Sequence, residues 1–507
     1  MTLGLIGIVI SLVVLITLAY RGMSVILAAP IAALVAMVLS GVPLLATYTE
    51  IFMPAMAGFV ASYFPIFLTG AIFGALMTYS GYATDLANII TKWVGPKRAM
   101  LATTLTAAVM TYGGISVFVA VFVMFPLARE LFRAANLPRR LIPAAIANGT
   151  LTFTMTALPG SPQVQNIIPG QFFQTSTFAA PGLGLLGGTI IFAVGMLWLE
   201  FRKRQLLKKG ESFTDLTKLE EEHGRDADLG MSSGPAGSTG ETAPDDETTV
   251  RSARSSDTSR STQSAPSSTL TQLRPRNHIY PFIPLLLVFA VNFGCTVLIF
   301  PAMDWSTLDD EQFGGVTLED RASIWAVLIA LLVAILSILI LNARNLRGLW
   351  QAIAHGTTNS MRPIFSTASE VGYGGVIASV GAFAIVRDGM FGISENALVT
   401  SAVSTSVISG ITGSASGGMT IALNALGDDF RQLAVEQSIS MEAMHRITAM
   451  ASGGLDSMPH NGAVITLLLV CGLTHRESYK DVGMITLVIP VAVTALLIPF
   501  IMVVGSF

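Results

Sequence analysis

Apolar residues follow one another along this chain in runs of about 20, the length that an α-helix needs to cross a lipid bilayer. Four further regions, near 99–128, 141–176, 396–426 and 443–474, are apolar but interrupted by Gly, Pro, Ser, Thr and Asn. The pattern predicts an all-α membrane protein with about 10 transmembrane helices, two of them broken. The uninterrupted runs lie near 2–20, 23–41, 58–80, 181–201, 280–301, 322–342, 361–386 and 484–505.

Basic residues indicate which loops face the cytoplasm, because such loops carry an excess of Lys and Arg. The stretches around Lys92 to Arg98 and Arg129 to Arg140 are both basic, so the region 99–128 begins and ends on the cytoplasmic side. About 30 residues are too few for two full spans. We therefore predict a re-entrant hairpin with its tip at "TYGGIS", residues 111–116.

The composition is typical of a membrane protein, and one segment differs from the rest in its high content of charged and small polar residues. The chain of 507 residues is 52% hydrophobic and 12% charged, and its net charge of −3 gives no indication of nucleic-acid binding. Residues 202–277 hold 24 of the 61 charged residues and are rich in Ser, Thr and Gly. We interpret this segment as a cytoplasmic, largely disordered linker. Cys295 and Cys471 lie in apolar runs and are expected to be buried packing residues, and the N-terminal run is expected to be a retained first span.

The two sides of the linker repeat each other. "YGGIS" at 112–116 matches "TGSAS" at 412–416, and "LPGS" at 158–161 matches "MPHN" at 458–461, with the same offset of 300 residues. The loop after the first hairpin is basic and the loop after the second is acidic, so the second half is predicted to be upside down. The domains are then a first repeat at 1–201, the linker, and a second repeat at 278–507, with hairpins near 99–128 and 396–426 and broken helices near 141–176 and 443–474. Inverted repeats with broken helices are typical of secondary transporters.

Four polar interruptions, the two hairpin tips and the two helix breaks, are expected to meet near the bilayer midplane. They offer hydroxyls and helix N-termini, which suit a carboxylate, and they contain no Lys or Arg. Asn148, ahead of the first break, completes the set. The candidate substrate-binding residues are Gly113, Gly114, Ser116, Asn148, Pro159, Gly160, Ser161, Gly413, Ser414, Ser416, Ser457 and Asn461.

Ionisable residues inside membrane segments are costly and are usually functional. Glu370 lies in the middle of a predicted span, and Asp456 and His460 flank the second break. The first break has no acid or imidazole. We therefore expect proton coupling at Asp456 and His460, with Glu370 as the alternative carrier.

Several stretches resemble the gluconate permease family, and within it the branch for D-β-hydroxybutyrate and related short hydroxy acids. They are "GGISVFVAVFVMFPLARELF", "ASEVGYGGVI", "SGITGSASGGMTIAL" and above all the run from "ASGGLDSMPHNGAVITLL" to "CGLTHRESYKD". The resemblance covers nearly the whole chain except the linker, which is longer and more polar than expected for this family.

This resemblance implies a proton-coupled symporter of organic acid anions, a member of the ion transporter superfamily in a bacterial cytoplasmic membrane. It also implies a homodimer with an elevator-like motion, in which hairpin tips and broken helices bind substrate and ion. By matching motif, it points to Gly114 and Ser116, Pro159 to Ser161, Ser414 and Ser416, and Asp456 to Asn461.

Two alternatives to a proton-coupled symporter stay open from the sequence. Sodium is the alternative coupling ion, because the tips "GGIS" and "GSAS" offer hydroxyl and carbonyl oxygens. An intramembrane hydrolase using Asp456 or His460 is a remote alternative, because the chain lacks G-x-S-x-G, H-E-x-x-H and G-x-G-D motifs. We expect no enzymatic activity, no metal and no cofactor beyond the coupling ion.

Overall fold

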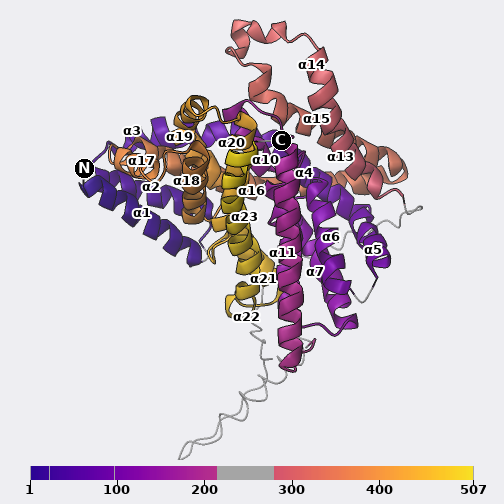
Figure 1. Cartoon of the computed structure of the whole chain (residues 1–507). Coiled ribbons are helices and arrows are strands. Elements are labelled where there is room, and N and C mark those ends of the chain that lie inside the picture. Colours follow the sequence, from indigo (N-terminus) through magenta and orange to yellow (C-terminus); the bar gives the residue numbers. More distant parts are fainter. Residues whose placement is uncertain (1, 22, 96–97, 214–278, 506–507) are drawn as a thin grey trace, which may run out of the picture. The chain divides into compact units, whose positions relative to one another are not determined.

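The protein is described by a computed structural model that covers residues 2–21, 23–95, 98–213 and 279–505 (Figure 1). All regular secondary structure in these ranges is helical. Among the described residues, five helices are long and apolar enough to cross a membrane, at Leu44–Tyr79, Pro181–Lys208, Phe282–Ala302, Leu318–Leu341 and His475–Val504, and the bent pair Ala343–Ser379 with Phe383–Phe391 makes a sixth if it is counted as one span. The predicted all-helical membrane class is confirmed at this level.

The first half contains the helices α1 to α11. They are α1 (Thr2–Tyr20), α2 (Val25–Ser40), α3 (Leu44–Thr47), which continues through a π-helical turn into α4 (Met53–Tyr79), α5 (Tyr82–Val94), α6 (Ala99–Tyr112), α7 (Val117–Ala134), α8 (Ile142–Thr150), α9 (Phe153–Thr156), α10 (Val164–Phe173) and α11 (Pro181–Lys208).

The second half contains α13 to α23. They are α13 (Phe282–Gly294), which continues into α14 (Phe300–Ala302), α15 (Leu318–Leu341), α16 (Leu346–Ser379), α17 (Phe383–Phe391), α18 (Ala397–Thr412), α19 (Ala415–Glu436), α20 (Met441–Leu455), α21 (Gly462–Cys471), and α22 (His475–Gly483), which continues into α23 (Ile489–Val504).

The two halves have helices in the same order and at nearly the same spacing. The helices α6, α7 and α10 begin at 99, 117 and 164, and α18, α19 and α21 begin 298 residues later, at 397, 415 and 462. Several contacts between the halves have a counterpart in which the roles of the halves are reversed. Helix α2 packs on α16 as α15 packs on α4, and α7 contacts α21 as α19 contacts α10. This reciprocal packing is what a pseudo-two-fold relation produces. The opposite membrane orientation of the halves stays a prediction.

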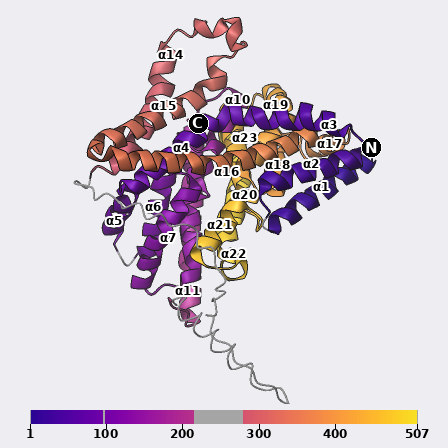
Figure 2. The ribbon, with the colours of Figure 1, turned by 180° about the vertical axis from the view of Figure 1, so that it is seen from behind.

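Helices α4 and α16 form the main contact between the halves and lie side by side (Figure 2). Small residues allow the close approach, since a Cβ on Gly356 of α16 would lie 2.7 Å from the Cα of Ile72 in α4. Helix α11 of the first half likewise packs along α23 of the second half (Figure 1). The repeats are therefore intertwined through both pairs.

Each predicted hairpin is a helix–turn–helix pair in the structure. Helix α6 has 14 residues, which gives a length of about 21 Å. That is shorter than the bilayer core of about 30 Å. Helix α18, with 16 residues, is similarly short. The geometry is compatible with re-entrant hairpins, whose depth in the membrane stays a prediction.

Two boundaries differ from those expected. The run predicted as a span at 361–386 belongs to a longer helix that ends at Ser379 and is followed, after a bend of 92°, by the separate helix α17. Helix α11 continues to Lys208, so the first residues of the predicted linker at 202–277 are helical. Residues 214–278, most of that linker, lie outside the described residues.

Candidate functional site

The first hairpin tip and the first helix break lie against each other. The tip is the turn between α6 and α7, and the break, called break 1, comprises residues 157–163 between α9 and α10. The hydroxyl of Tyr112 donates to the carbonyl oxygen of Pro159 at 2.7 Å, and the side-chain amide of Gln163 donates to the carbonyl oxygen of Thr111 at 2.8 Å. The structure thus brings Gly113 and Gly114 to break 1.

Break 1 is held open by hydrogen bonds that replace those of a continuous helix. Ser161 is buried, and its hydroxyl donates to the carbonyl oxygen of Thr154 at 2.6 Å. Gly160 has a φ of +73° and donates its N–H to Thr177 at 2.9 Å. A Cβ at Gly160 would collide with the ring of Phe178. Glycine is required there by both conformation and space.

The second tip and the second break are joined in the same way. Break 2 comprises residues 456–461 between α20 and α21. The side-chain amide of Asn461 donates to the carbonyl oxygens of Gly413 and Asp456, both at 3.0 Å. Its oxygen accepts from the N–H of Val464 at 2.8 Å, so Asn461 also caps the N-terminus of α21.

The three ionisable candidates gather around the second tip. A Cβ on Gly413, which has a φ of +65°, would lie 2.6 Å from Cδ2 of His460. Asp456, 3% exposed, accepts from the hydroxyl of Ser457 at 3.0 Å. Glu370 of α16 faces the N-terminal turn of α19, where the side chain of Ser414 lies near its carboxyl group and where a Cβ on Gly417 would collide with its Oε2.

Glu370 is 5% exposed, and its Oε2 has no hydrogen-bond partner among the described residues. Burying a carboxylate with an unpaired oxygen costs free energy, and protonation of the group lowers that cost. At the matching position of the first half, 298 residues earlier, the chain has Ile72 in the aligned stretch "PIFLTGAIFG". The acid is therefore present in one of the two matching helices, α16, and absent from α4.

Other predicted residues lie apart from the breaks or play simpler roles. Asn148 is fully buried against Gly195 of α11, and neither of its side-chain polar atoms has a partner in the described part of the chain. Ser116 precedes α7 without a side-chain cap, whereas Ser414 caps α19 by accepting from the N–H of Gly417 at 3.1 Å. The carbonyl of Ser416, 8% exposed, accepts from Thr420 at 2.8 Å.

A cavity of about 460 Å³ adjoins this second tip. Helices α4, α10, α16 and α19 surround it, and Val371, next to Glu370, contributes to its wall. The hydroxyl of Tyr63 on α4 donates to the side-chain oxygen of Gln171 on α10 at 2.6 Å, so a hydrogen bond joins two of the walls. The cavity is lined by Ala55, Gly58, Phe59, Ser62, Tyr63, Gln171, Phe172, Val371, Gly374, Gly375, Ala378, Thr420, Ile421, Asn424 and Ala425.

One charged residue was missed by the sequence analysis. Arg446 is the last residue of the acidic stretch 427–446, which follows the second hairpin and is predicted to be an external loop, but it lies in α20 and is fully buried. Its guanidinium donates to the side-chain oxygen of Asn166 at 2.7 Å and to the carbonyl oxygen of Ala179 at 2.7 Å. The four polar stretches indeed lack Lys and Arg, but a cation reaches break 1 from the other half of the chain.

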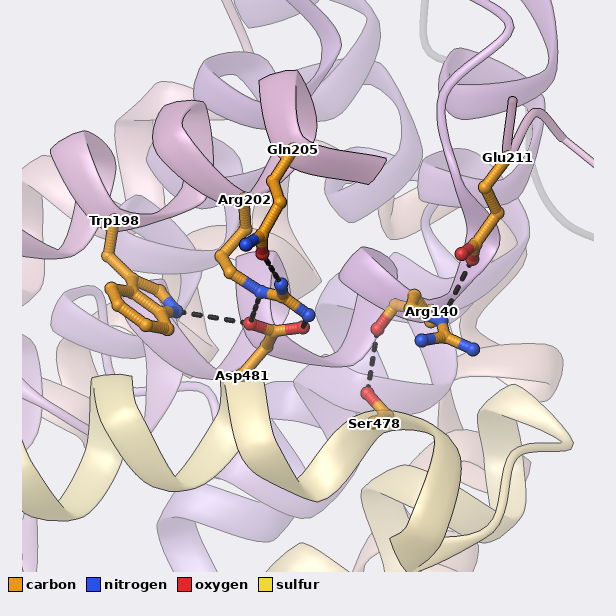
Figure 3. A network of polar contacts seen from close by, with 7 residues as sticks. All are labelled: Arg140, Trp198, Arg202, Gln205, Glu211, Ser478 and Asp481. Atoms are coloured by element: carbon orange, nitrogen blue, oxygen red, sulfur yellow. Dashed lines mark hydrogen bonds and ion pairs between the residues drawn. The ribbon is translucent and has the colours of Figure 1, made fainter. Parts of the chain in front are cut away.

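A second buried cation ties the halves together near the end of α11 (Figure 3). Arg202 forms an ion pair with Asp481 of α22 at 2.6 Å, and the indole of Trp198 donates to the same carboxylate at 3.2 Å. Beside it, Arg140 pairs with Glu211 at 2.8 Å. Two residues of the predicted linker, Arg202 and Glu211, are therefore anchored to the helical body.

The described residues contain no cluster of three or more His, Cys, Asp or Glu side chains that could hold a metal ion. Cys295 and Cys471 are buried and are not joined in a disulfide.

Comparison with known proteins assigns this architecture to a family. A sequence model described as "Citrate transporter" (CitMHS) matches residues 10–427. The chain belongs to the citrate transporter family. It is 42% identical over 499 residues to the "Uncharacterized transporter YxjC" of Bacillus subtilis, covering 97% of this chain and 98% of that protein. It is also 28% identical over 162 residues to an "Uncharacterized transporter" of Haemophilus influenzae, covering 31% of this chain and 36% of that protein.

Membership in this family makes the protein a multi-pass membrane transporter and not a member of a known enzyme family. The resemblance of the motifs to gluconate permeases is confirmed at the level of the ion transporter superfamily. The narrower assignment to the gluconate permease family, and to its hydroxybutyrate branch, stays a prediction.

Proposed function

We propose that this protein is a proton-coupled symporter that carries a small organic acid anion into the cell. The candidate substrates are citrate, from the family description, and gluconate and 3-hydroxybutyrate, from the motifs. The observation that supports the proposal most is the pairing of each hairpin tip with the helix break of its own half. Each pair places helix N-termini and neutral polar groups together, which suits an anion.

The same geometry supports a proton as the coupling ion. Asp456, His460 and Glu370 lie around the second tip, and one oxygen of Glu370 lacks a hydrogen-bond partner in the described residues. Buried acids in such a setting are the usual elements of proton relays in transporters. Asp456 with His460 is the preferred pair, and Glu370 is the rival carrier.

The proposed motion divides the helices into two groups. Helices α1, α2, α4, α13, α15 and α16 pack largely on one another, and the hairpins, broken helices, α11 and α23 do so as well. We infer that the second group moves against the first in an elevator-like cycle, within a homodimer. The cavity between α4, α16, α10 and α19 lies at the boundary between these groups.

Uptake into proteoliposomes tests the proposal. The purified chain is reconstituted, and accumulation of labelled citrate, gluconate and 3-hydroxybutyrate is measured with and without an inward proton gradient. We expect gradient-driven accumulation of at least one anion. Uptake of none of them, or uptake that ignores the gradient, contradicts the proposal. Replacing sodium by choline at constant pH identifies the alternative, because a large loss of uptake would make sodium the coupling ion.

A further inference from the structure

Arg446 is a buried cation whose hydrogen-bond partners are all neutral. Its side chain is fully buried in α20. Besides the bonds to Asn166 and Ala179 at 2.7 Å, Nε donates to the carbonyl oxygen of Ala179 at 3.1 Å and Nη2 to that of Thr177 at 3.3 Å. These four bonds engage all three nitrogens of the guanidinium but leave the positive charge without a counter-charge. Such a charge is expensive to bury.

No carboxylate of the described residues lies within ion-pair distance of Arg446. The acid with an electrostatic effect on it is Glu442, one turn earlier in α20. Glu442 is exposed, and its Oε2 accepts from the N–H of Ala180 at 3.1 Å. An exposed carboxylate is screened by water and compensates a buried cation weakly. The field of Arg446 therefore extends into the protein interior.

Asn166 connects this cation to break 1. It lies in the first turn of α10, and its side-chain nitrogen donates to the carbonyl oxygen of Ser161 at 2.9 Å and to that of Thr177 at 3.0 Å. The same side chain accepts from Arg446 through its oxygen. The guanidinium is thus two hydrogen bonds away from break 1, at the end of α10 where the helix dipole is also positive.

Another buried arginine, Arg139, donates to the C-terminal end of a helix and lies away from both breaks. Arg139, 7% exposed, donates to the carbonyl oxygens of Cys471 and Gly472 at the C-terminal end of α21. That end carries the negative pole of the helix dipole, which stabilises a cation locally. Arg139 is therefore the control: it is a buried guanidinium that donates to backbone carbonyls of the opposite half, and the ten residues of α21 separate those carbonyls from break 2.

We propose that Arg446, acting through Asn166, supplies the positive charge that attracts the substrate carboxylate to break 1. This inference rests on the proposed function, since it assumes that an organic anion is carried. Arg446 is a positioning residue that does not touch the substrate. It gives the first break the charge that its own sequence lacks, and it leaves the acids at the second break free to handle protons.

The test compares three variants in proteoliposomes, using whichever of citrate, gluconate and 3-hydroxybutyrate the wild type carries. Arg446→Gln removes the charge, and Arg446→Lys keeps it. Asn166→Asp neutralises the charge with a carboxylate and keeps the bond to Arg446, at the expense of the two bonds to Ser161 and Thr177. Two unit charges roughly 8–10 Å apart interact by about fifteenfold to thirtyfold in affinity at an effective dielectric constant of about 20. We expect Arg446→Gln and Asn166→Asp to raise KM by about that factor and to change kcat far less, and the KM of Arg446→Lys to stay within about threefold of the wild-type value.

Arg139→Gln is the control and is expected to lower thermal stability but leave KM unchanged. A folded, monodisperse Asn166→Asp or Arg446→Gln protein with wild-type KM overturns the inference, and so does a Lys variant as impaired as Gln. If Arg446→Gln does not fold, Asn166→Asp decides. A wild type that carries none of the three anions refutes the proposed function itself, and the inference with it.

Discussion

The ion pair between Arg202 and Asp481 provides a quantitative test of how the halves are held together. The side chains of this pair are 7% and 1% exposed, and the carboxylate also accepts from Trp198 (Figure 3). Replacing Asp481 by Leu leaves the guanidinium buried without its counter-charge, which costs about 3–5 kcal/mol. Replacing both residues, as Arg202→Met with Asp481→Leu, removes both charges. It should cost only about 1 kcal/mol, mainly from the lost partner of Trp198.

The free energy of unfolding is measured in mixed detergent micelles by far-UV circular dichroism, for both single variants and the double variant. Each single change should cost about 3–5 kcal/mol and the double change about 1 kcal/mol, so the expected coupling energy is at least about 5 kcal/mol. Arg204→Met is the control: this side chain is 73% exposed and pairs with Glu200 at 3.3 Å, so its loss should cost about 0.5 kcal/mol or less. Additive single effects, or an Asp481→Leu variant no less stable than the control, would refute the reasoning.

Three further results are expected. Gly413→Ala should abolish transport, because residue 413 has a left-handed backbone conformation and its new Cβ would collide with His460. Gly294→Ala is the control and should transport normally, because its Cβ would have open space; uptake assays on both variants test this. Asn461→Ala should lower the free energy of unfolding by about 1–2 kcal/mol through loss of the α21 cap, measured in the same micelles, and equal stability would contradict this role. Asp456→Asn should prevent gradient-driven accumulation yet permit anion exchange, and normal accumulation would exclude Asp456 from the mechanism.

The sequence predicted the helical elements well where their signals are local. Runs of apolar residues marked α11 and α23, and Gly and Ser clusters marked both tips and both breaks. The start of α16 was missed because its first turns, "LRGLWQAIAHGTTNS", are polar and lack the apolar run used to define a span. Length and hydropathy detect helices that face lipid, but an amphipathic extension is indistinguishable from a loop by that criterion.

Arg446 could not be placed from the sequence because its environment is built from distant residues. Its partners Asn166 and Ala179 lie 280 and 267 residues away in the chain. A basic residue beside acids near a predicted loop is normally a sign of topology, and the positive-inside rule uses it as such. Only the exchange of contacts between α10 and α20 shows that this cation faces the interior.

The same exchange explains how two nearly equivalent halves can hold different charges. Where α4 has the apolar Ile72, α16 has Glu370 beside the second tip. Break 2 has Asp456 and His460, whereas break 1 receives Arg446 from the other half of the chain. On the proposed assignment, anion and proton therefore occupy separate breaks. The helices that precede the breaks, α9 and α20, approach each other at Gly453, a non-helical point in α20 where a Cβ would lie 2.6 Å from Cγ2 of Thr156. Because the space between them is so small, a shift of one helix end displaces the other, and on the proposed assignment this contact lets movement at one break reach the other.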